Sequence, residues 1–133
     1  MAGAFSNYME GKIIDSFLRN TAYTPAATVY LALYESSPGE TNAGTETSYT
    51  GYARQAVAWT AEDVATGQTK NTAQITFPAN GNASASVTIT SLAIYDALTT
   101  GNMLMYADLS SSKTLAVGDV LAFAANAIVF TID

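Results

Sequence analysis

Two absences limit the chemistry open to this chain, because its 133 residues include neither histidine nor cysteine. Histidine is the commonest general base and metal ligand, and the cysteine thiolate is a strong nucleophile. A serine triad would lack its histidine, and a zinc site would lack a suitable set of ligands. Carboxylate or lysine chemistry is what remains. We expect no catalytic residue, no metal and no cofactor.

Two pairs of carboxylates are candidates for glycosidase-like chemistry, which needs two carboxyl groups roughly 5 to 10 Å apart in a cleft. Glu62 and Asp63 are adjacent in a polar segment, where solvated charge explains them. Asp96 and Asp108 flank a predicted hairpin at Gly101 on facing strands, but aspartate at a strand end is usually a turn or capping residue. We therefore interpret these carboxylates as structural and predict that the protein is not an enzyme.

A calcium site would need several oxygen ligands at close, regular spacing. Glu35, Glu40 and Glu46 lie in one polar stretch, but the stretch lacks the D-x-[DN]-x-[DN]-G pattern of a calcium loop. We therefore predict no calcium site there.

Arg54 is one of five basic residues and lies in the middle of GYARQAVAW, residues 51–59, which alternates like a β-strand. Its side chain has three candidate roles: a catalytic group, a clamp for an anionic ligand, or a tie between structural elements. A single arginine beside tyrosine more often packs on an aromatic ring or pairs with a carboxylate. We predict a structural tie, with Glu46, Asp96 or Asp108 as the partner.

Residues 5–18, FSNYMEGKIIDSFL, are the segment with clear helical periodicity. Phe5, Met9, Ile13 and Phe17 recur every four residues, and Pro25 blocks any extension. A helix this short is marginal alone in water, so we expect its apolar stripe to lie on another apolar surface.

Beyond the helix, period-two patterns separated by turn residues predict about eight strands. The expected strands are 28–34, 51–59, 73–77, 87–95 with a kink near Ser91, 103–109, 113–117, 120–124 and 127–132. Residues 35–51 are expected to form a long exposed loop, 60–71 a loop or short helical turn, 79–86 a turn-rich loop and 110–113 a turn. This spacing predicts one domain over 1–133, with a helix at 5–18 and a β-sandwich over 26–132. The fold class is all-β: an antiparallel, jelly-roll-like sandwich with one N-terminal helix.

Composition narrows the range of partners. Only 12% of the residues are charged, about half the usual share, and the net charge is −6 with scattered basic residues. This balance predicts no nucleic-acid binding. The sequence shows no basic leader and no run of roughly 18 apolar residues, so we expect a protein that is made in the cytoplasm and binds no membrane. A weakly charged surface suits a protein packed against other proteins.

Five stretches carry a resemblance to a known family: AFSNYMEGKIIDSFL, TAYTPAATVYLALYESSPGE, GYARQAV, AQITFP and the closing SLAIYDALTTGNMLMYADLSSSKTLAVGDVLAFAANAIVFT. Together they cover nearly the whole chain and resemble a family of small tailed-bacteriophage virion proteins, often labelled tail-fibre proteins. The resemblance implies a non-enzymatic structural component of the phage particle, located in the virion.

Two roles follow from this resemblance. The first is a capsid cement, or decoration, protein on the outer surface of the head, bridging major capsid protein subunits and neighbouring copies of itself as a dimer or trimer. It is preferred because 133 residues without elongated repeats are few for a complete fibre. The alternative is a tail or tail-fibre-associated protein that contacts a host receptor or glycan.

Residues for partner contact are expected on the helix and the two loops. The eight tyrosines either form a sugar- or protein-binding face or bury their rings with the hydroxyls at the edge. The candidate contact residues are Phe5, Tyr8, Met9, Glu40, Thr45, Tyr49, Asn80 and Asn82.

Overall fold

The computed structural model describes residues 3–132, which contain one α-helix and nine β-strands. The elements in chain order are β1 (Ala4–Phe5), α1 (Asn7–Leu18), β2 (Val29–Tyr34), β3 (Gln55–Val57), β4 (Gln68–Lys70), β5 (Ile75–Thr76), β6 (Val87–Tyr95), β7 (Met103–Leu115), β8 (Ala122–Phe123) and β9 (Val129–Thr131). The predicted all-β fold with a single N-terminal helix is confirmed.

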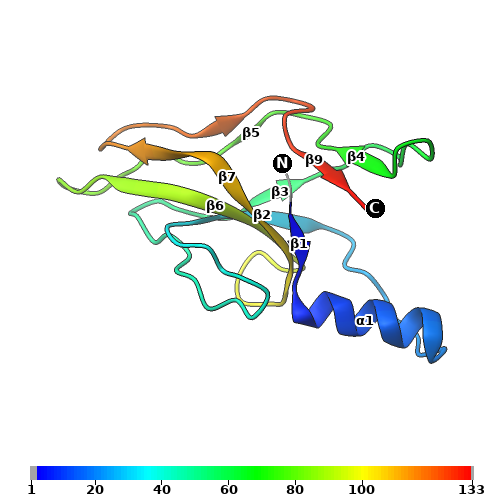
Figure 1. The fold of residues 1–133 in the computed structure, drawn as a ribbon. Helices are drawn as coiled ribbons and strands as arrows, with labels where there is room; N and C mark the ends of the chain where they lie inside the picture. The colour runs from blue at the N-terminus through cyan, green and yellow to red at the C-terminus, as the bar shows by residue number, and fades with distance from the viewer. Residues whose placement is uncertain (1–2, 133) are drawn as a thin grey trace.

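The strands form two layers. Five of them make an antiparallel sheet in the order β1-β7-β6-β2-β3, and the others form the antiparallel pairs β4-β9 and β5-β8. Figure 1 shows these pairs along one side of the larger sheet. The main core lies between the layers. Alternate residues of a strand point to the same face, so each strand contributes every second side chain to this core. Its members include Leu31, Leu33, Ile89, Leu92 and Ile94 from the larger sheet and Ile75, Phe77, Leu121 and Ile128 from the opposite layer.

The β6–β7 hairpin is the longest feature of the sheet. Its strands pair as far as Val87 opposite Leu115, so β7 runs through the turn that was predicted over 110–113. Ile89 pairs with Lys113 and Ser91 pairs with Asp108, so β7 carries extra residues in this stretch. The serines therefore form a bulge within a continuous strand and not the turn predicted there. The register shift lies between Ile89 and Ser91, at the place where a kink in this strand was predicted.

The segment 35–51 is a loop whose residues are mostly exposed, as predicted, but it folds back on the sheet and a few of its residues are buried. The backbone N–H of Glu35 donates to the carbonyl of Thr45 at 2.9 Å, and that of Thr47 donates to the carbonyl of Leu33 at 2.9 Å. Thr47 and Tyr49 are buried. Tyr49 belongs to the main core, whereas Asn42 bonds to Tyr34 and Tyr95 on the opposite face of the larger sheet.

The N-terminal arm begins with a strand, so the helix starts at Asn7 and not at Phe5 as predicted. Ala4 and Phe5 pair with Tyr106 and Met105 of β7. This pairing attaches the arm to the edge of the larger sheet.

Ser6 is the N-cap of α1 and joins the helix to β7. Its hydroxyl accepts a hydrogen bond from the N–H of Met9 at 3.2 Å and donates one to the carbonyl of Met103. Its own N–H donates to the carbonyl of Leu104 at 3.0 Å. Ser6 is 2% exposed, so these bonds are shielded from water.

We expect Ser6→Ala to lower the free energy of unfolding by about 2 kcal/mol, since it removes a cap and leaves a buried carbonyl without its donor. The measurement is the midpoint of urea unfolding. Ser16→Ala is the matched control, because the Ser16 hydroxyl makes only a long bond of 3.3 Å to the Thr21 carbonyl near the surface. Equal effects of the two substitutions would contradict the role assigned to Ser6.

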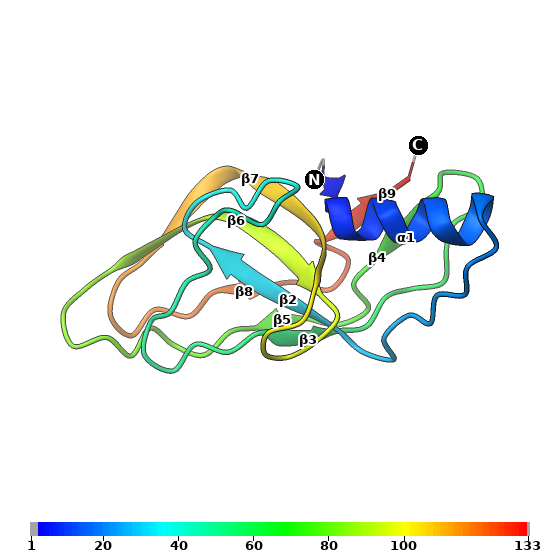
Figure 2. The same cartoon turned by 90° about the horizontal axis from the view of Figure 1, so that it is seen from below.

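Only the first half of α1 packs against the body. Tyr8 and Met9 contact the core, whereas Ile14, Phe17 and Leu18 are 52%, 82% and 79% exposed. The expectation that the apolar stripe lies on another apolar surface therefore holds for the first half of the helix alone. Figures 1 and 2 show α1 starting beside β1 and running away from the larger sheet. Within the described residues, no helix has the length and apolar character needed to cross a membrane.

Candidate functional site

Arg54 is the centre of a buried polar network. Its Nε and Nη2 donate to the two carboxylate oxygens of Glu46, each at 2.8 Å, which makes a bidentate ion pair. Its Nη1 donates to the carbonyls of Ala97 and Thr100 at 3.0 and 2.7 Å. Arg54 therefore joins the long loop to the turn between β6 and β7. Each guanidinium nitrogen donates within the chain, and four of the five N–H groups are used in this way, which fits a structural tie better than a clamp for an external anion.

Aromatic side chains enclose this ion pair. The Tyr95 ring lies 3.5 Å from the guanidinium carbon of Arg54, close enough for a cation–π contact. The hydroxyl of Tyr95 lies 2.5 Å from that of Tyr34. The side-chain amide of Asn42 donates to Tyr95 and accepts from Tyr34, both at 2.7 Å. We call Arg54, Glu46, Tyr34, Tyr95, Asn42 and Tyr52 the arginine cluster.

Tyr52 completes the arginine cluster on the side of the main core. Its hydroxyl donates to Glu46 at 2.8 Å and accepts from the N–H of Leu33 at 3.1 Å. Its ring stacks on Phe77 with 6.2 Å between the centroids. The cluster thus links both faces of the larger sheet.

Burial changes the acid–base behaviour of the arginine cluster. Burial, followed by the hydrogen bond to Tyr95, raises the pKa of Tyr34 well above its ordinary value. Burial is also the largest cause of the raised pKa of Tyr52. Burial alone would lower the pKa of Arg54, but the hydrogen bonds and charge of Glu46 outweigh it and raise that pKa. Tyr34 and Tyr52 therefore stay neutral and Arg54 stays charged in the folded protein.

We expect the free energy of unfolding to fall as the pH rises above about 10, the ordinary pKa of tyrosine. Tyr34 and Tyr52 have raised pKa values in the folded state. Above that pH they release their protons only in the unfolded state, which favours unfolding. Each tyrosine contributes a slope of at most about 1.4 kcal/mol per pH unit. The measurement is urea unfolding from neutral to alkaline pH. Tyr34→Phe should reduce the slope, and an unchanged slope would contradict this account.

Asp96 and Asp108 do not form a pair. Asp96 accepts hydrogen bonds from the backbone N–H and side-chain amide of Asn102, at 2.7 and 2.9 Å, and so holds the hairpin turn. Asp108 accepts from the hydroxyl of Ser91 at 2.7 Å. Ser91 and Asp96 lie five residues apart along the chain, a span of about 16 Å in extended backbone. This is wider than the carboxylate separation that glycosidase chemistry needs, and neither aspartate is the partner of Arg54.

Two of the other acidic candidates accept hydrogen bonds within their own loops or strand ends. Asp63 accepts from the N–H of Ala65 and the hydroxyl of Thr66 at 3.0 and 2.8 Å, and these bonds, the one from Thr66 first, lower the pKa of Asp63. Glu35 accepts from the hydroxyl of Thr47 at 2.7 Å. Within residues 3–132, no three acidic side chains gather in a way that could hold a metal ion.

Two of the predicted contact residues lie inside the fold. Tyr49 is 4% exposed and donates to the carbonyl of Pro78 at 2.8 Å. Asn80 is fully buried and donates to the carbonyls of Ala85 and Leu115 at 3.1 and 2.9 Å. Neither is a surface residue of this chain, because each satisfies backbone groups of its own fold.

The six other candidates lie at or near the surface. Glu40 and Thr45 are exposed on the long loop, whereas Phe5, Tyr8, Met9 and Asn82 are half-buried. Phe5 packs edge-on against Phe130 with 5.7 Å between the ring centroids.

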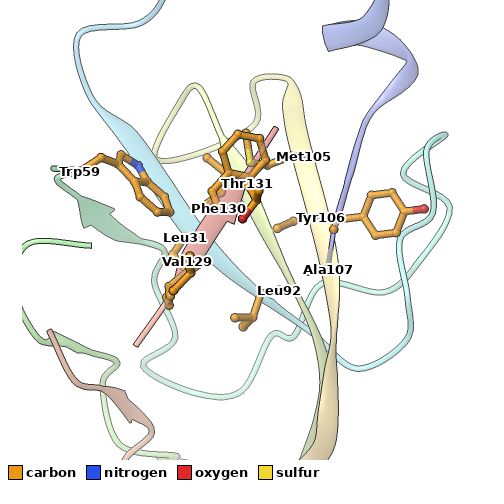
Figure 3. Close-up of a pocket in the computed structure, with 13 residues that line it drawn as sticks. Leu31, Trp59, Leu92, Met105, Tyr106, Ala107, Val129, Phe130 and Thr131 are labelled. Atoms are coloured by element: carbon orange, nitrogen blue, oxygen red, sulfur yellow. The ribbon is translucent and has the colours of Figure 1, made fainter. Parts of the chain in front are cut away.

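Sequence reasoning missed an open hollow of about 370 Å³ between β9 and the larger sheet. Its walls include Trp59, Met105, Ala107, Phe130 and Thr131, and none of its lining residues is charged. Figure 3 shows β9 crossing in front of the strands of the larger sheet, with Trp59 to one side and the Tyr106 ring pointing away. We call this feature the β9 hollow. It forms where strands distant in the sequence meet, so no single segment signals it.

A comparison with known families adds to this geometry. Residues 4–131 match the family model described as podophage GP4 fiber I protein gp80. A match of this extent defines a structural protein of the phage virion. The chain belongs to the podophage GP4 fiber I protein gp80 family. No curated protein is similar enough to count as a match. The resemblance to phage virion proteins is thus confirmed for the class, and the family implies location in the virion.

Proposed function

We propose that this chain is a non-enzymatic structural component of a phage fibre or of the tail that carries it. The family is named for a fibre, and its match extends over residues 4–131. That name supports the tail alternative better than the capsid cement role preferred from sequence.

The observation that carries the proposal is the exposed end of α1. A contiguous set of large apolar side chains on a soluble domain marks a surface for another protein. Ile14, Phe17 and Leu18 form such a set on a helix whose first half is fixed to the body by the Ser6 cap. The internal bonds of Arg54 and Asp96 give these groups structural roles, which supports a function without catalysis.

The capsid cement role remains the competing proposal for location. A surface with few charges suits contact with capsid subunits as well as with fibre subunits, since burying an unpaired charge is costly in both. Under either role the partners are other virion proteins and further copies of this chain.

The test is to locate the chain in purified virions by cryo-EM, with gold-labelled antibody as an independent readout. We expect density and label at the tail or its fibres. Many copies spread over the head would overturn the proposal and establish the cement role. A protease-treated virion sample without tails is the control, because it should lose the label together with the tail.

As a tail protein, the chain would contact the host cell, and this contact is part of the proposal. Loop residues Glu40 and Thr45 are exposed on a segment that the arginine cluster holds in place. The purified protein should then compete with virions for adsorption to host cells, and Glu40→Ala with Thr45→Ala should weaken this competition. Competition that is absent, or unchanged in the variant, would remove host contact by this loop from the proposal.

A further inference from the structure

The same chain carries an apolar projection and an apolar recess, and both are open to solvent. The projection is the set Ile14, Phe17 and Leu18, which we call the helix knob. These residues stand at positions i, i+3 and i+4, so they share one face of α1. Single exposed apolar side chains are ordinary, whereas three on one face of a short helix are a contact surface.

The recess is the β9 hollow. Residues on its rim, including Trp59, Ala107 and Phe130, are half-buried, and Thr131 is exposed, so the hollow opens to the surface. Its volume of about 370 Å³ lies within the size range of sites that hold compact apolar groups.

Both surfaces carry little net charge. No lining residue of the β9 hollow carries a charge. At the helix knob, Asp15 and Arg19 pair with each other at 2.8 Å, so the helix end presents little net charge. A neutral knob can enter a neutral hollow without leaving an unpaired charge in an apolar site.

The geometry points to a second copy of this chain as the partner of each surface: the helix knob of one copy seats in the β9 hollow of another. This inference rests on the proposed function, because a fibre component must contact other chains. The knob and the hollow are different surfaces of one molecule, and such contacts join copies head to tail or reciprocally. The knob is smaller than the roughly 800 Å² per partner of a standard interface. The contact is therefore weak for one pair and gains strength where many copies are held together.

The chain has no cysteine, so single introduced cysteines report this contact cleanly. Ser16→Cys places a thiol beside the helix knob, and Thr131→Cys places one at the rim of the β9 hollow. The two variants are mixed at a concentration of about 100 μM, suited to a weak interface, and treated with a short bis-maleimide. We expect cross-links mainly between the two different variants, identified by mass after labelling one with heavy isotopes.

Two further variants decide whether the helix knob causes the cross-link. Adding Phe17→Ser and Leu18→Ser to the helix variant should reduce the yield by at least about tenfold, which is about 1.4 kcal/mol of contact energy. These side chains are 82% and 79% exposed, so the fold should survive, and circular dichroism checks it. Val64→Ser is the control, because Val64 is 87% exposed in another part of the chain and the yield should not change.

Three results would overturn the inference: cross-links between two helix variants only, no cross-link above the level of a cysteine placed at Val64, or an unchanged yield after the knob substitutions. Any of them combined with density at the tail in cryo-EM would leave the proposed function standing. A failure of the knob-and-hollow inference can therefore be distinguished from a failure of the proposed function.

Discussion

Arg54→Met is expected to lower the free energy of unfolding by about 3 kcal/mol, which corresponds to a drop of about 10 °C in melting temperature for a domain of this size. Arg54 is 9% exposed and its side chain ends in four hydrogen bonds. Methionine fills similar space but donates none of them. It leaves the Glu46 carboxylate with only the Tyr52 hydroxyl as a donor and takes the arginine donor from two carbonyls, which costs more than the intact pair contributes. The side chain of Glu46 is 25% exposed, so the expected loss of stability is at the lower end of the range for breaking a buried ion pair.

A double-mutant cycle with Glu46→Gln separates the ion pair from the rest of this effect. We expect the double variant to lose less stability than the two single variants together, because neither charge is then left alone. Arg19→Met is the control. It breaks the exposed pair with Asp15, whose side chains are 71% and 34% exposed, and should change stability by less than about 0.5 kcal/mol. If Arg54→Met had no larger effect than Arg19→Met, the structural role of Arg54 would be refuted.

Asn71→Ala should be comparably destabilising, by about 3 kcal/mol, since three hydrogen bonds depend on this one buried side chain. Asn71 is 0% exposed. Its amide donates to the carbonyls of Ala73 and Ala124 at 2.8 and 2.9 Å, and its oxygen accepts from the N–H of Ile128 at 2.8 Å. The side chain therefore fixes the turn that leads into β9. Alanine removes one hydrogen bond from each of these three backbone groups and leaves the buried N–H of Ile128 without its acceptor.

Hydrogen exchange gives this second prediction a local readout. The amide hydrogen of Ile128 should exchange much faster in Asn71→Ala than in the unaltered protein. Exchange rates of amides in the β6–β7 hairpin should change only by the amount that follows from the change in global stability. Asn82→Ala is the matched control, because Asn82 is half-buried and bonds to Thr50 and Ala85 near the surface. We expect it to cost less than about 1 kcal/mol. Unchanged exchange at Ile128 would show that Asn71 does not hold this turn.

Periodicity located the long strands because their core residues alternate. β2 and β6 were expected almost at their observed bounds. Apolar residues fill every second position from Val29 in β2, and they alternate in β6 on either side of Ser91. Of the strand expected over 51–59, only Gln55–Val57 pairs with β2, and Trp59 makes an isolated bridge to Asn71. Tyr52 and Arg54 precede the paired residues of β3, and their side chains bind Glu46.

Short polar strands gave no such signal. β4, with the sequence QTK, has no apolar residue and was expected to be part of a loop or helical turn. It is a strand because β9 pairs with it, Lys70 opposite Val129. β1 was assigned to the helix because Phe5 fits the helical repeat, although its backbone pairs with β7. Both strands are specified by partners distant in the sequence, which a local pattern does not contain.

The candidate site was predictable only in its chemistry. Residue types indicated that Arg54 would contact a carboxylate or an aromatic ring, and it contacts both, Glu46 and Tyr95. The choice of Glu46 over Asp96 depends on how the long loop folds back, which the polar sequence of that loop does not reveal. The burial of Asn71 was missed for a related reason: asparagine between polar neighbours looks like a surface residue until its three backbone partners are known.

The pairing of β1 with β7 has a consequence for how the chain is made. Ala4 and Phe5 leave the ribosome about a hundred residues before Tyr106 and Met105, which they must pair with. At the usual rate of synthesis this delay is on the order of ten seconds. The arm and its apolar helix therefore wait undocked while the middle of the chain folds. On a polysome, where several nascent copies lie close together, a waiting arm can meet the sheet edge of a neighbour before its own is complete, so early exchange of arms competes with closure of each chain on itself.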